Sequence, residues 1–241
     1  MALDEAAMGP ARSGDIVFRV YRWQPGCVSL GRNQPTAGTL GGRSVRDFQP
    51  GLDVVRRPTG GRSVYHGSEL TYAFAAPDRF LGGPKGIHRG VHRALAAALR
   101  ALGVPIDAAD GAAPAAAGPI PIDVRECFVD AAPGEITAAG RKLVGSAQWR
   151  HRGAILLHGS ILVRNEQHRA TVSGEGGGGA IGLEDVCGSP PPIGALGDAL
   201  VEAVAALTGL PVSRGGPTAD VETAAAALEE RYGSVEWTWR R

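Results

Sequence analysis

The stretch RRPTGGRSVYHGSELTYA, residues 56–73, carries the pattern that decides the fold. It begins where the apolar run Leu52–Arg56 ends and turns at the paired glycines Gly60 and Gly61. Two short strand-like runs follow, Ser63–His66 and Leu70–Ala75. Paired glycines let the backbone approach a ligand closely and expose N–H groups. Because three arginines and a histidine flank the turn, this corner suits a carboxylate or a polarised carbonyl.

Strand and helix patterns extend in both directions from this stretch. Gly86–Leu102 is the clearest helix, because apolar residues recur at helical spacing and Gly103 follows as a stop. Residues Asp107–Pro121, which are almost all Ala, Gly, Pro and Asp, predict a surface excursion. Strands with interspersed helices indicate an α/β or α+β domain. Three further helices are expected, at Met1–Met8, which ends at Gly9-Pro10, at Leu196–Leu207, which ends at Gly209, and at Thr218–Tyr232, which ends at Gly233. The other expected strands are Ile16–Trp23, Cys27–Leu30, Ile136–Ala139, Lys142–Gly145 and Ala154–Val163. Hairpin turns are expected at Gly140 and Gly153.

Composition limits the class of protein. The chain has 241 residues, 44% of them hydrophobic, and a net charge of +1. We therefore predict a single domain, residues 1–241, that binds neither nucleic acid nor an anionic membrane surface. Its apolar runs are far shorter than the roughly 20 residues that span a bilayer. The opening MALDEAAM has two acids and no base, unlike a signal or transit peptide, so we expect a cytoplasmic protein.

The cysteines and histidines form no metal or redox motif. Cys27, Cys127 and Cys187 lie 100 and 60 positions apart, so each is treated as a lone thiol. His88 and His92 are four residues apart on the predicted long helix. The Glu of H-E-x-x-H and a third ligand are missing, so we interpret these histidines as a solvated or capping pair and expect no metal.

A second motif, GRKLVGSAQ at Gly140–Gln148, offers a lysine and, three residues later, another glycine that permits close approach. Only Lys85 and Lys142 are lysine among the 25 basic residues, so an ammonium at position 142 is a candidate for a specific role. Taken alone, this motif and the corner at 56–67 are as compatible with structural turns as with a site.

Taken together, the motifs resemble the lipoate–protein ligase and octanoyltransferase superfamily. The resemblance implies a mixed β-sheet flanked by helices, like the catalytic domains of biotin and lipoate protein ligases, with a tunnel for a medium-chain acyl group. It also implies attachment of octanoyl or lipoyl groups to a lysine of a lipoyl carrier domain. The matching segments are LGRNQ (Leu30–Gln34), RRPTGGRSVYH (Arg56–His66), ELTYA (Glu69–Ala73), GRKLVGSAQ (Gly140–Gln148), LLHGSIL (Leu156–Leu162) and RYGSVEW (Arg231–Trp237).

One cysteine separates the chemistries within this superfamily. Ligases activate the acyl group with ATP, whereas octanoyltransferases carry it on a cysteine. The order Cys127-Phe128, Glu135-Ile136 and Gly140-Arg141-Lys142 resembles one octanoyltransferase branch. Gly67 departs from that branch, in which an acid usually follows the histidine. The chain also ends shortly after Trp237, without the accessory domain of many ligases. We therefore favour transfer over ligation, and Cys127 over Cys187 as nucleophile, with Cys27 in the core.

The resemblance implies a mechanism. A free thiol with a pKa near 8.5 is only about 3% thiolate at pH 7. An ammonium about 5 Å away stabilises the thiolate by roughly 3 kcal/mol at an effective dielectric constant near 20, so Lys142 is sufficient to activate Cys127. Backbone N–H groups near Gly145–Ala147 would join Lys142 in stabilising the oxyanion. His66 is the candidate partner of the acyl carbonyl or a proton relay, and His158 either borders the pocket or is a core histidine. The expected acyl- and substrate-binding residues are Arg57, Gly60, Gly61, Arg62, His66, Gly145, Ser146, Ala147 and His158.

The expected partners are acyl carrier protein as donor and a lipoyl carrier domain as acceptor, such as glycine cleavage H protein or a 2-oxoacid dehydrogenase E2. No cofactor is expected for this transfer. The main alternative is a lipoate ligase that uses ATP and Mg²⁺. The others are an amidotransferase that moves the acyl group between carrier domains through the same cysteine, and a lipoyl-domain binder without activity.

Overall fold

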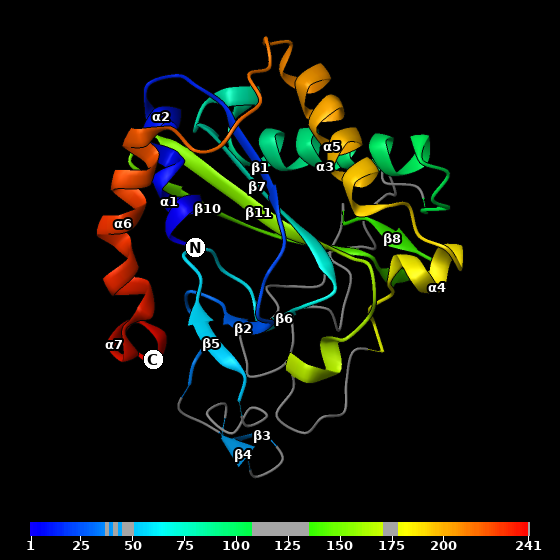
Figure 1. Cartoon of the computed structure of the whole chain (residues 1–241), viewed down its shortest axis with the longest axis horizontal. Coiled ribbons are helices and arrows are strands. Elements are labelled where there is room, and N and C mark those ends of the chain that lie inside the picture. The colour runs from blue at the N-terminus through cyan, green and yellow to red at the C-terminus, as the bar shows by residue number, and fades with distance from the viewer. Residues whose placement is uncertain (37–38, 41–42, 45–50, 108–134, 171–177, 241) are drawn as a thin grey trace.

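The computed structural model describes residues 1–36, 39–40, 43–44, 51–107, 135–170 and 178–240 (Figure 1). Its largest sheet has four strands in the order β1-β7-β11-β10, each antiparallel to its neighbours. The long β7–β11 pair crosses the middle of this sheet, and β10 lies at its edge. The strands are β1 (Val17–Tyr21), β7 (Glu69–Pro77), β10 (Val144–His151) and β11 (Ala154–Leu162).

A second sheet has three strands in the order β5-β2-β6. Strand β2 runs parallel to β5 and antiparallel to β6, so this sheet is mixed. Two short hairpins complete the described strands. The bounds are β2 (Cys27–Leu30), β3 (Thr39–Leu40), β4 (Arg43–Ser44), β5 (Asp53–Arg56), β6 (Val64–His66), β8 (Thr137–Ala138) and β9 (Arg141–Lys142).

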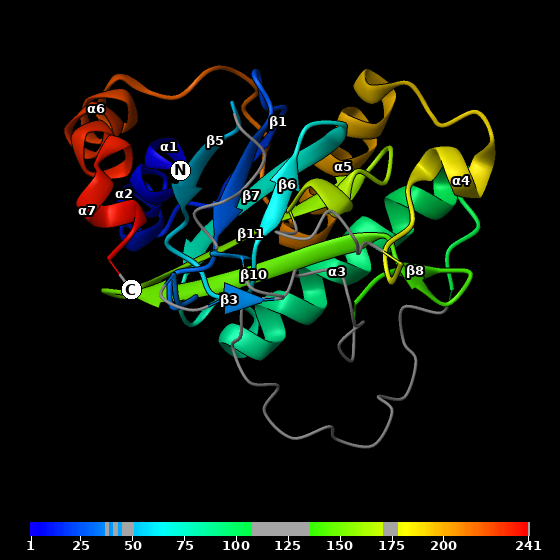
Figure 2. The same cartoon turned by 90° about the horizontal axis from the view of Figure 1, so that it is seen from below.

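Helices cover both faces of the four-stranded sheet (Figure 2). Helices α3 and α5 pack together on one face, while α1 and α2 lie on the other, where α6 packs against α1. No helix in the described ranges is both long and apolar enough to cross a membrane. The helices are α1 (Ala2–Ala6), α2 (Met8–Arg12), α3 (Pro84–Ala101), α4 (Leu183–Cys187), α5 (Ile193–Thr208), α6 (Ala219–Gly233) and α7 (Val235–Thr238), with 3₁₀ turns at Phe80–Gly82 and Gln167–Ala170.

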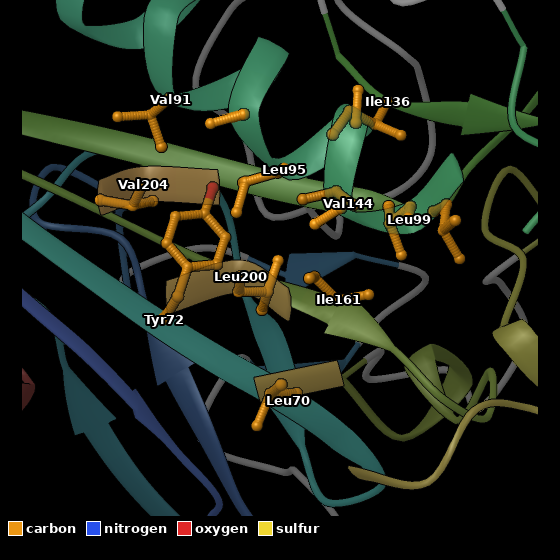
Figure 3. Packing of buried hydrophobic residues seen from close by; sticks show 14 of the residues in the cluster. Leu70, Tyr72, Val91, Leu95, Leu99, Ile136, Val144, Ile161, Leu200 and Val204 are labelled. Atoms are coloured by element: carbon orange, nitrogen blue, oxygen red, sulfur yellow. The ribbon is translucent and has the colours of Figure 1, made fainter. Parts of the chain in front are cut away.

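The alternation of side chains along β7 builds the two faces. Tyr72 and Phe74 enter the main core beneath α3 and α5, and Ala73 and Ala75 contact α2 on the opposite face. The small alanines let α2 approach the sheet closely. Figure 3 shows the main core, in which the labelled members are Leu70, Tyr72, Val91, Leu95, Leu99, Ile136, Val144, Ile161, Leu200 and Val204.

The predicted fold class is confirmed as α+β, with its strands divided between an antiparallel and a mixed sheet. The hairpins turn at Gly140 (φ +69°) and Gly153 (φ +82°), as predicted. The single opening helix is wrong, because Gly9 and Pro10 lie inside α2. Proline is tolerated there since the first-turn N–H groups of a helix have no intrahelical acceptor. All but the first residue of the predicted excursion at 107–121 lies outside the described residues.

Candidate functional site

A pocket lies between the two sheets, and the two predicted motifs meet in it. Residues from β2 and β6 form one wall, and residues from β1, β7, β10 and β11 form the other. The lining comprises Met1, Tyr21, Trp23, Ser29, Arg57, Val64, His66, Thr71, Gly145, Ser146, Ala147, His158, Gly159 and Ser160.

The glycine corner is held in place by Arg57. Its guanidinium donates to the carbonyl oxygens of Gly60 (2.8 Å), Arg62 (2.6 Å) and Ser29 (3.0 Å). A Cβ on Gly31 would lie 1.8 Å from the carbonyl oxygen of Gly61, so only glycine permits the two loops to touch. The close approach at Gly61 is therefore to the loop that contains Gly31, another part of the same chain.

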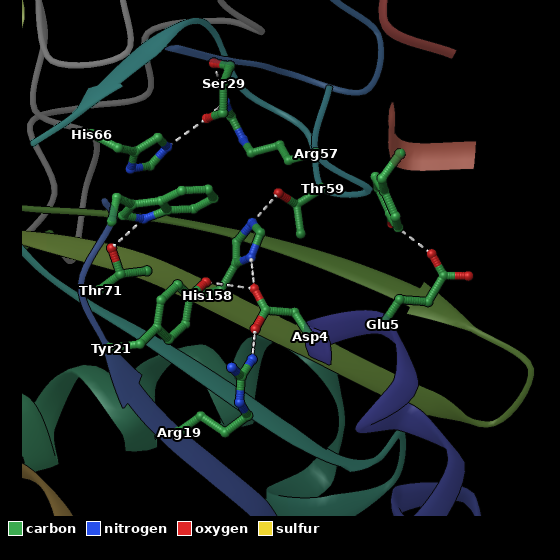
Figure 4. A network of polar contacts seen from close by, with 12 residues as sticks. Asp4, Glu5, Arg19, Tyr21, Ser29, Arg57, Thr59, His66, Thr71 and His158 are labelled. Atoms are coloured by element: carbon green, nitrogen blue, oxygen red, sulfur yellow. Dashed lines mark hydrogen bonds and ion pairs between the residues drawn. The ribbon is translucent and has the colours of Figure 1, made fainter. Parts of the chain in front are cut away.

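His66 is fixed on both sides of its ring. Its Nδ1 lies 2.7 Å from Oε1 of Glu69. Its Nε2 lies 2.7 Å from Oγ of Ser29, a contact that is drawn in Figure 4. Trp23 stacks on the imidazole with a centroid separation of 4.5 Å, and the indole N–H donates to Thr71. A histidine, a carboxylate and a hydroxyl are thus aligned in the wall of the pocket.

His158 both lines the pocket and has buried polar partners, so each of the alternatives raised by the sequence holds. Its Nε2 lies 2.6 Å from Oγ1 of Thr59, and its Nδ1 lies 3.2 Å from the carboxylate of Asp4. Arg19 and Tyr21 also donate to Asp4. Burial acts to raise the pKa of Asp4, but His158, the N-terminal ammonium and Arg19 outweigh it and lower the pKa to about 2. Burial lowers the pKa of His158.

A further polar chain crosses β11 beside the pocket. Gly159 lies between Tyr72 and Ser146 in the register, and its lack of a side chain lets the two hydroxyls bond across the strand. Nε2 of His92 lies 2.7 Å from Oγ of Ser146. His88 stacks on His92, with ring centroids 4.0 Å apart.

The prediction of a solvated or capping histidine pair is therefore wrong. His92 is buried, and its ring bonds to a residue of the candidate site. The sequence contains a signal for this, because His92, Leu95 and Leu99 follow the i, i+3, i+7 spacing of one helix face. That face is the one that α3 packs onto the sheet.

Lys142 is buried on β9, at the start of the second motif, and is not part of the pocket lining. Its Nζ lies 2.6 Å from Oε1 of Glu135. Burial lowers the pKa of His88, and the Lys142 ammonium lowers it further. The main-chain N–H of Lys142 donates to the Gly179 carbonyl (2.8 Å), which ties the hairpin to the following segment.

The cysteines occupy different environments. Cys27 is in the core on β2, as predicted, and burial with the charges of Glu69 and Asp53 raises the pKa of its thiol to about 12. Cys187, at the end of α4, lies in a separate groove and has a pKa raised by burial. Cys127 lies outside the described residues.

The pocket brings together Arg57, His66, Gly145–Ala147 and His158 among the expected binding residues, but its lining leaves out Gly60, Gly61 and Arg62. Sequence reasoning missed Ser29, Trp23 and Thr71 in the lining, and Glu69 and Asp4 behind the histidines. Their polar types alone do not distinguish them from ordinary strand or helix residues. Within the described part of the chain, no three His, Cys, Asp or Glu side chains are grouped to bind a metal.

Comparison with known proteins shows the family. Residues 1–203 match the model of the lipoyl protein ligase A/B catalytic domain. The chain is 33% identical to octanoyltransferase LipM of Moorella thermoacetica over 100% of its own length and 93% of that protein, and 32% identical to LipM of Kyrpidia tusciae over 100% and 94%.

Solved structures show the same fold. A putative lipoate protein ligase of T. acidophilum, Ta0514, with bound lipoic acid, matches with a TM-score of 0.74 at 21% identity, covering 99% of this chain and 92% of that one. Lipoate-protein ligase A bound with ATP matches with a TM-score of 0.75 at 22% identity and the same coverage. Because the family model matches most of its length and octanoyltransferase LipM of Moorella thermoacetica is 33% identical to all of it, the chain belongs to the lipoyl protein ligase A/B catalytic domain family.

Proposed function

We propose that this protein is an acyltransferase that moves an octanoyl group from octanoyl-acyl carrier protein, through a thioester on Cys127, to a lysine of a lipoyl carrier domain. The observation that carries the proposal is the similarity, over the whole chain, to proteins named octanoyltransferase. The pocket between the sheets supports it, because residues of both motifs line it. Passing from thioester to amide is downhill, so the reaction needs no nucleotide.

The environments of the other thiols support the choice of Cys127. Cys27 is a poor nucleophile because its pKa is raised to about 12, and attack requires the thiolate. Cys187 lies in a groove with Leu102 and Pro190–Pro192, apart from the pocket lining. Neither thiol therefore competes well with Cys127 for the acyl group.

Lys142 and strand β10 are the proposed source of oxyanion stabilisation. The ion pair with Glu135 holds the ammonium of Lys142 in one place at the head of the second motif. Because β10 is an edge strand, alternate N–H groups along Gly145–Ala147 point away from β11, its neighbour in the sheet. Such groups, together with the ammonium, would stabilise the negative charge of the tetrahedral intermediate.

The test is acylation without nucleotide. The full chain is incubated with octanoyl-acyl carrier protein, and its intact mass is measured before and after adding a lipoyl domain. We expect one octanoyl adduct that disappears when the domain is octanoylated. Cys127→Ala should give neither adduct nor product, while the matched control Cys187→Ala should behave as the wild type.

Two results would contradict the proposal. A wild-type chain that stays unmodified but lipoylates the domain when ATP and Mg²⁺ are added would identify a ligase. Transfer from an octanoylated carrier domain, with none from acyl carrier protein, would identify an amidotransferase.

A further inference from the structure

Ser29, His66 and Glu69 form a hydrogen-bonded chain whose outer member, Ser29, lines the pocket. Figure 4 shows the contact between Ser29 and His66. We propose that this chain is the general base that takes the proton from the acceptor lysine when its amine attacks the acyl thioester. The inference rests on the proposed function and adds to it the groups that move the proton. Sequence reasoning singled out only His66 among the three.

The contacts of Glu69 determine which ring nitrogen carries the hydrogen. Its carboxylate accepts from the N–H of Gly67 (2.6 Å) and the hydroxyl of Thr71 (3.3 Å), and Nδ1 of His66 lies 2.7 Å away. An ionised carboxylate only accepts, so Nδ1 of His66 donates to it. Nε2 is then the acceptor, and the hydroxyl of Ser29 donates to it over 2.7 Å. This is the alignment of hydroxyl, imidazole and carboxylate that transfers protons in acyl chemistry.

The surroundings favour proton transfer through Ser29. Arg57 donates to Oγ of Ser29 (3.1 Å), and its positive charge stabilises the oxygen as negative charge develops on it. The stack on Trp23 holds the imidazole, which leaves little room for His66 to rotate away. The ionisable groups around His66 are Glu69, Arg57, Cys27 and Tyr21. Cys27 pairs with His66 between strands β2 and β6, and the pKa of its thiol is raised. Tyr21 contacts the indole of Trp23, which stacks on His66.

In the proposed step, the amine of the acceptor lysine replaces the thiolate at the acyl carbon. The lysine Nζ attacks the acyl carbon, and a C–N bond forms. The nitrogen loses a proton to Oγ of Ser29 as Ser29 passes its own hydrogen to Nε2 of His66. The C–S bond then breaks with its electron pair on sulfur, and the thiolate takes the proton from His66. The products are the amide and the free thiol, with Ser29 and His66 restored.

A second chain of the same residue classes provides an internal control. Thr59, His158 and Asp4 are aligned in the same way, with a hydroxyl, an imidazole and a carboxylate in contact. Thr59 is absent from the pocket lining, and Asp4 is already bound by Arg19. This second chain therefore contributes no hydroxyl to the lining, and we expect it to orient His158 and stabilise the fold without taking the proton.

The experiment measures the two half-reactions separately in the full chain. Formation of the octanoyl adduct from octanoyl-acyl carrier protein is followed by intact mass, and transfer to a lipoyl domain by single-turnover kinetics. Ser29→Ala and His66→Gln should lower the rate of the second half-reaction by about 100-fold, as for loss of a general base. Adduct formation and the KM for the lipoyl domain should change by less than about 3-fold.

Rescue by a conservative variant separates this role from a structural one. Ser29→Thr keeps the hydroxyl and should restore most of the rate of transfer. Glu69→Gln should slow transfer without changing adduct formation, because a neutral amide no longer stabilises the positive charge that develops on the imidazole as it takes the proton. Thr59→Val is expected to lower stability without the ~100-fold loss of transfer.

Three outcomes would overturn the proposal that the chain of Ser29, His66 and Glu69 is the general base. One is a wild-type rate of transfer in Ser29→Ala and His66→Gln, and another is a wild-type rate of transfer in Glu69→Gln. An octanoyl adduct on Ser29 itself would make this residue a nucleophile instead. Failure of the wild-type chain to form any adduct or product would reject the proposed function, which is a different result.

Discussion

Asp4 shows how one residue joins distant parts of this chain. Its carboxylate is fully buried and binds Arg19 and Tyr21 of β1 and His158 of β11. Burial of a lone charge is strongly unfavourable, so these partners are what allow Asp4 to remain ionised. The contact fixes α1 over the sheet and orients a histidine of the pocket.

The pKa of Asp4 predicts how stability depends on pH. Folding lowers this pKa from 3.8 to about 2, so the folded state binds a proton less readily than the unfolded state does. The resulting stabilisation, on the order of 2 kcal/mol, is fully present above pH 3.8 and is lost as the pH falls through about 2. Asp4→Asn should therefore lower the free energy of unfolding by about that amount at pH 7, and by much less near pH 2.

Urea denaturation at both pH values measures this difference. Asp15→Asn is the matched control, because Asp15 is exposed, and it should change stability by less than about 0.5 kcal/mol. An equal loss in Asp4→Asn at pH 7 and near pH 2 would show that Asp4 acts through its shape and not its charge. The sequence did not predict this cluster, because its members lie at positions 4, 19, 21 and 158.

At the scale of the elements, two glycines of α5 have opposite requirements. Gly209 ends the helix in the left-handed conformation, with φ of +65° and ψ of +13°, where an L side chain is strained. Gly194 lies in the first turn of α5, is exposed, and has no atom within 4 Å of the position of a Cβ. The backbone therefore requires glycine at position 209 but not at position 194.

We therefore predict changes of opposite sign on substitution with alanine. Gly209→Ala should lower the free energy of unfolding by about 1 kcal/mol, whereas Gly194→Ala should raise it by about 0.5–1 kcal/mol, because alanine restricts the unfolded chain and favours the helix. Thermal unfolding of the two variants beside the wild type measures both. A loss of stability in both would contradict the assignment of the two positions.

Helices and strands that are marked by a local sequence pattern were predictable. The apolar spacing of Gly86–Leu102 gave α3 to within two residues at its start, and Gly209 marked the end of α5. The opening helix was not predictable, because Gly9 and Pro10 usually stop a helix. Here Pro10 is tolerated near the start of a second short helix, which is stabilised by packing Met8 and Ala11 against alanines of the sheet.

For the whole molecule, the meeting of the two motifs was predictable only through the family resemblance. The residues that line the pocket between them come from both sheets, so no local pattern contains this contact. Ser29 was missed because it is a single polar residue within an apolar strand, and His92 was misinterpreted as solvated because other polar residues surround it in the sequence of α3. Their roles follow from partners that are 37 and 54 positions away in sequence.

Arg56 ties the end of the chain to the corner of the pocket. This fully buried guanidinium donates to the carbonyl oxygens of Thr238 (2.9 Å) and Gln34 (2.8 Å) and to that of Gly31. The indole N–H of Trp237 donates back to the carbonyl oxygen of Arg56 (2.7 Å). Because Gly31 touches the Gly60-Gly61 corner, α7 supports the pocket although it contributes no residue to its lining.

Replacing this one side chain should consequently loosen the C-terminus. A lysine at position 56 keeps the charge but lacks the planar fork that reaches several carbonyl groups at once, so Arg56→Lys should lower the free energy of unfolding by about 2–4 kcal/mol. Hydrogen exchange should rise first in 234–240 and then in the loop at 31–34, since both lose the same donor. Arg89→Lys, at an exposed position of α3, is the control and should leave both measurements unchanged. If exchange rose equally throughout the protein in Arg56→Lys, Arg56 would stabilise the core in general and would not specifically connect α7 to the pocket.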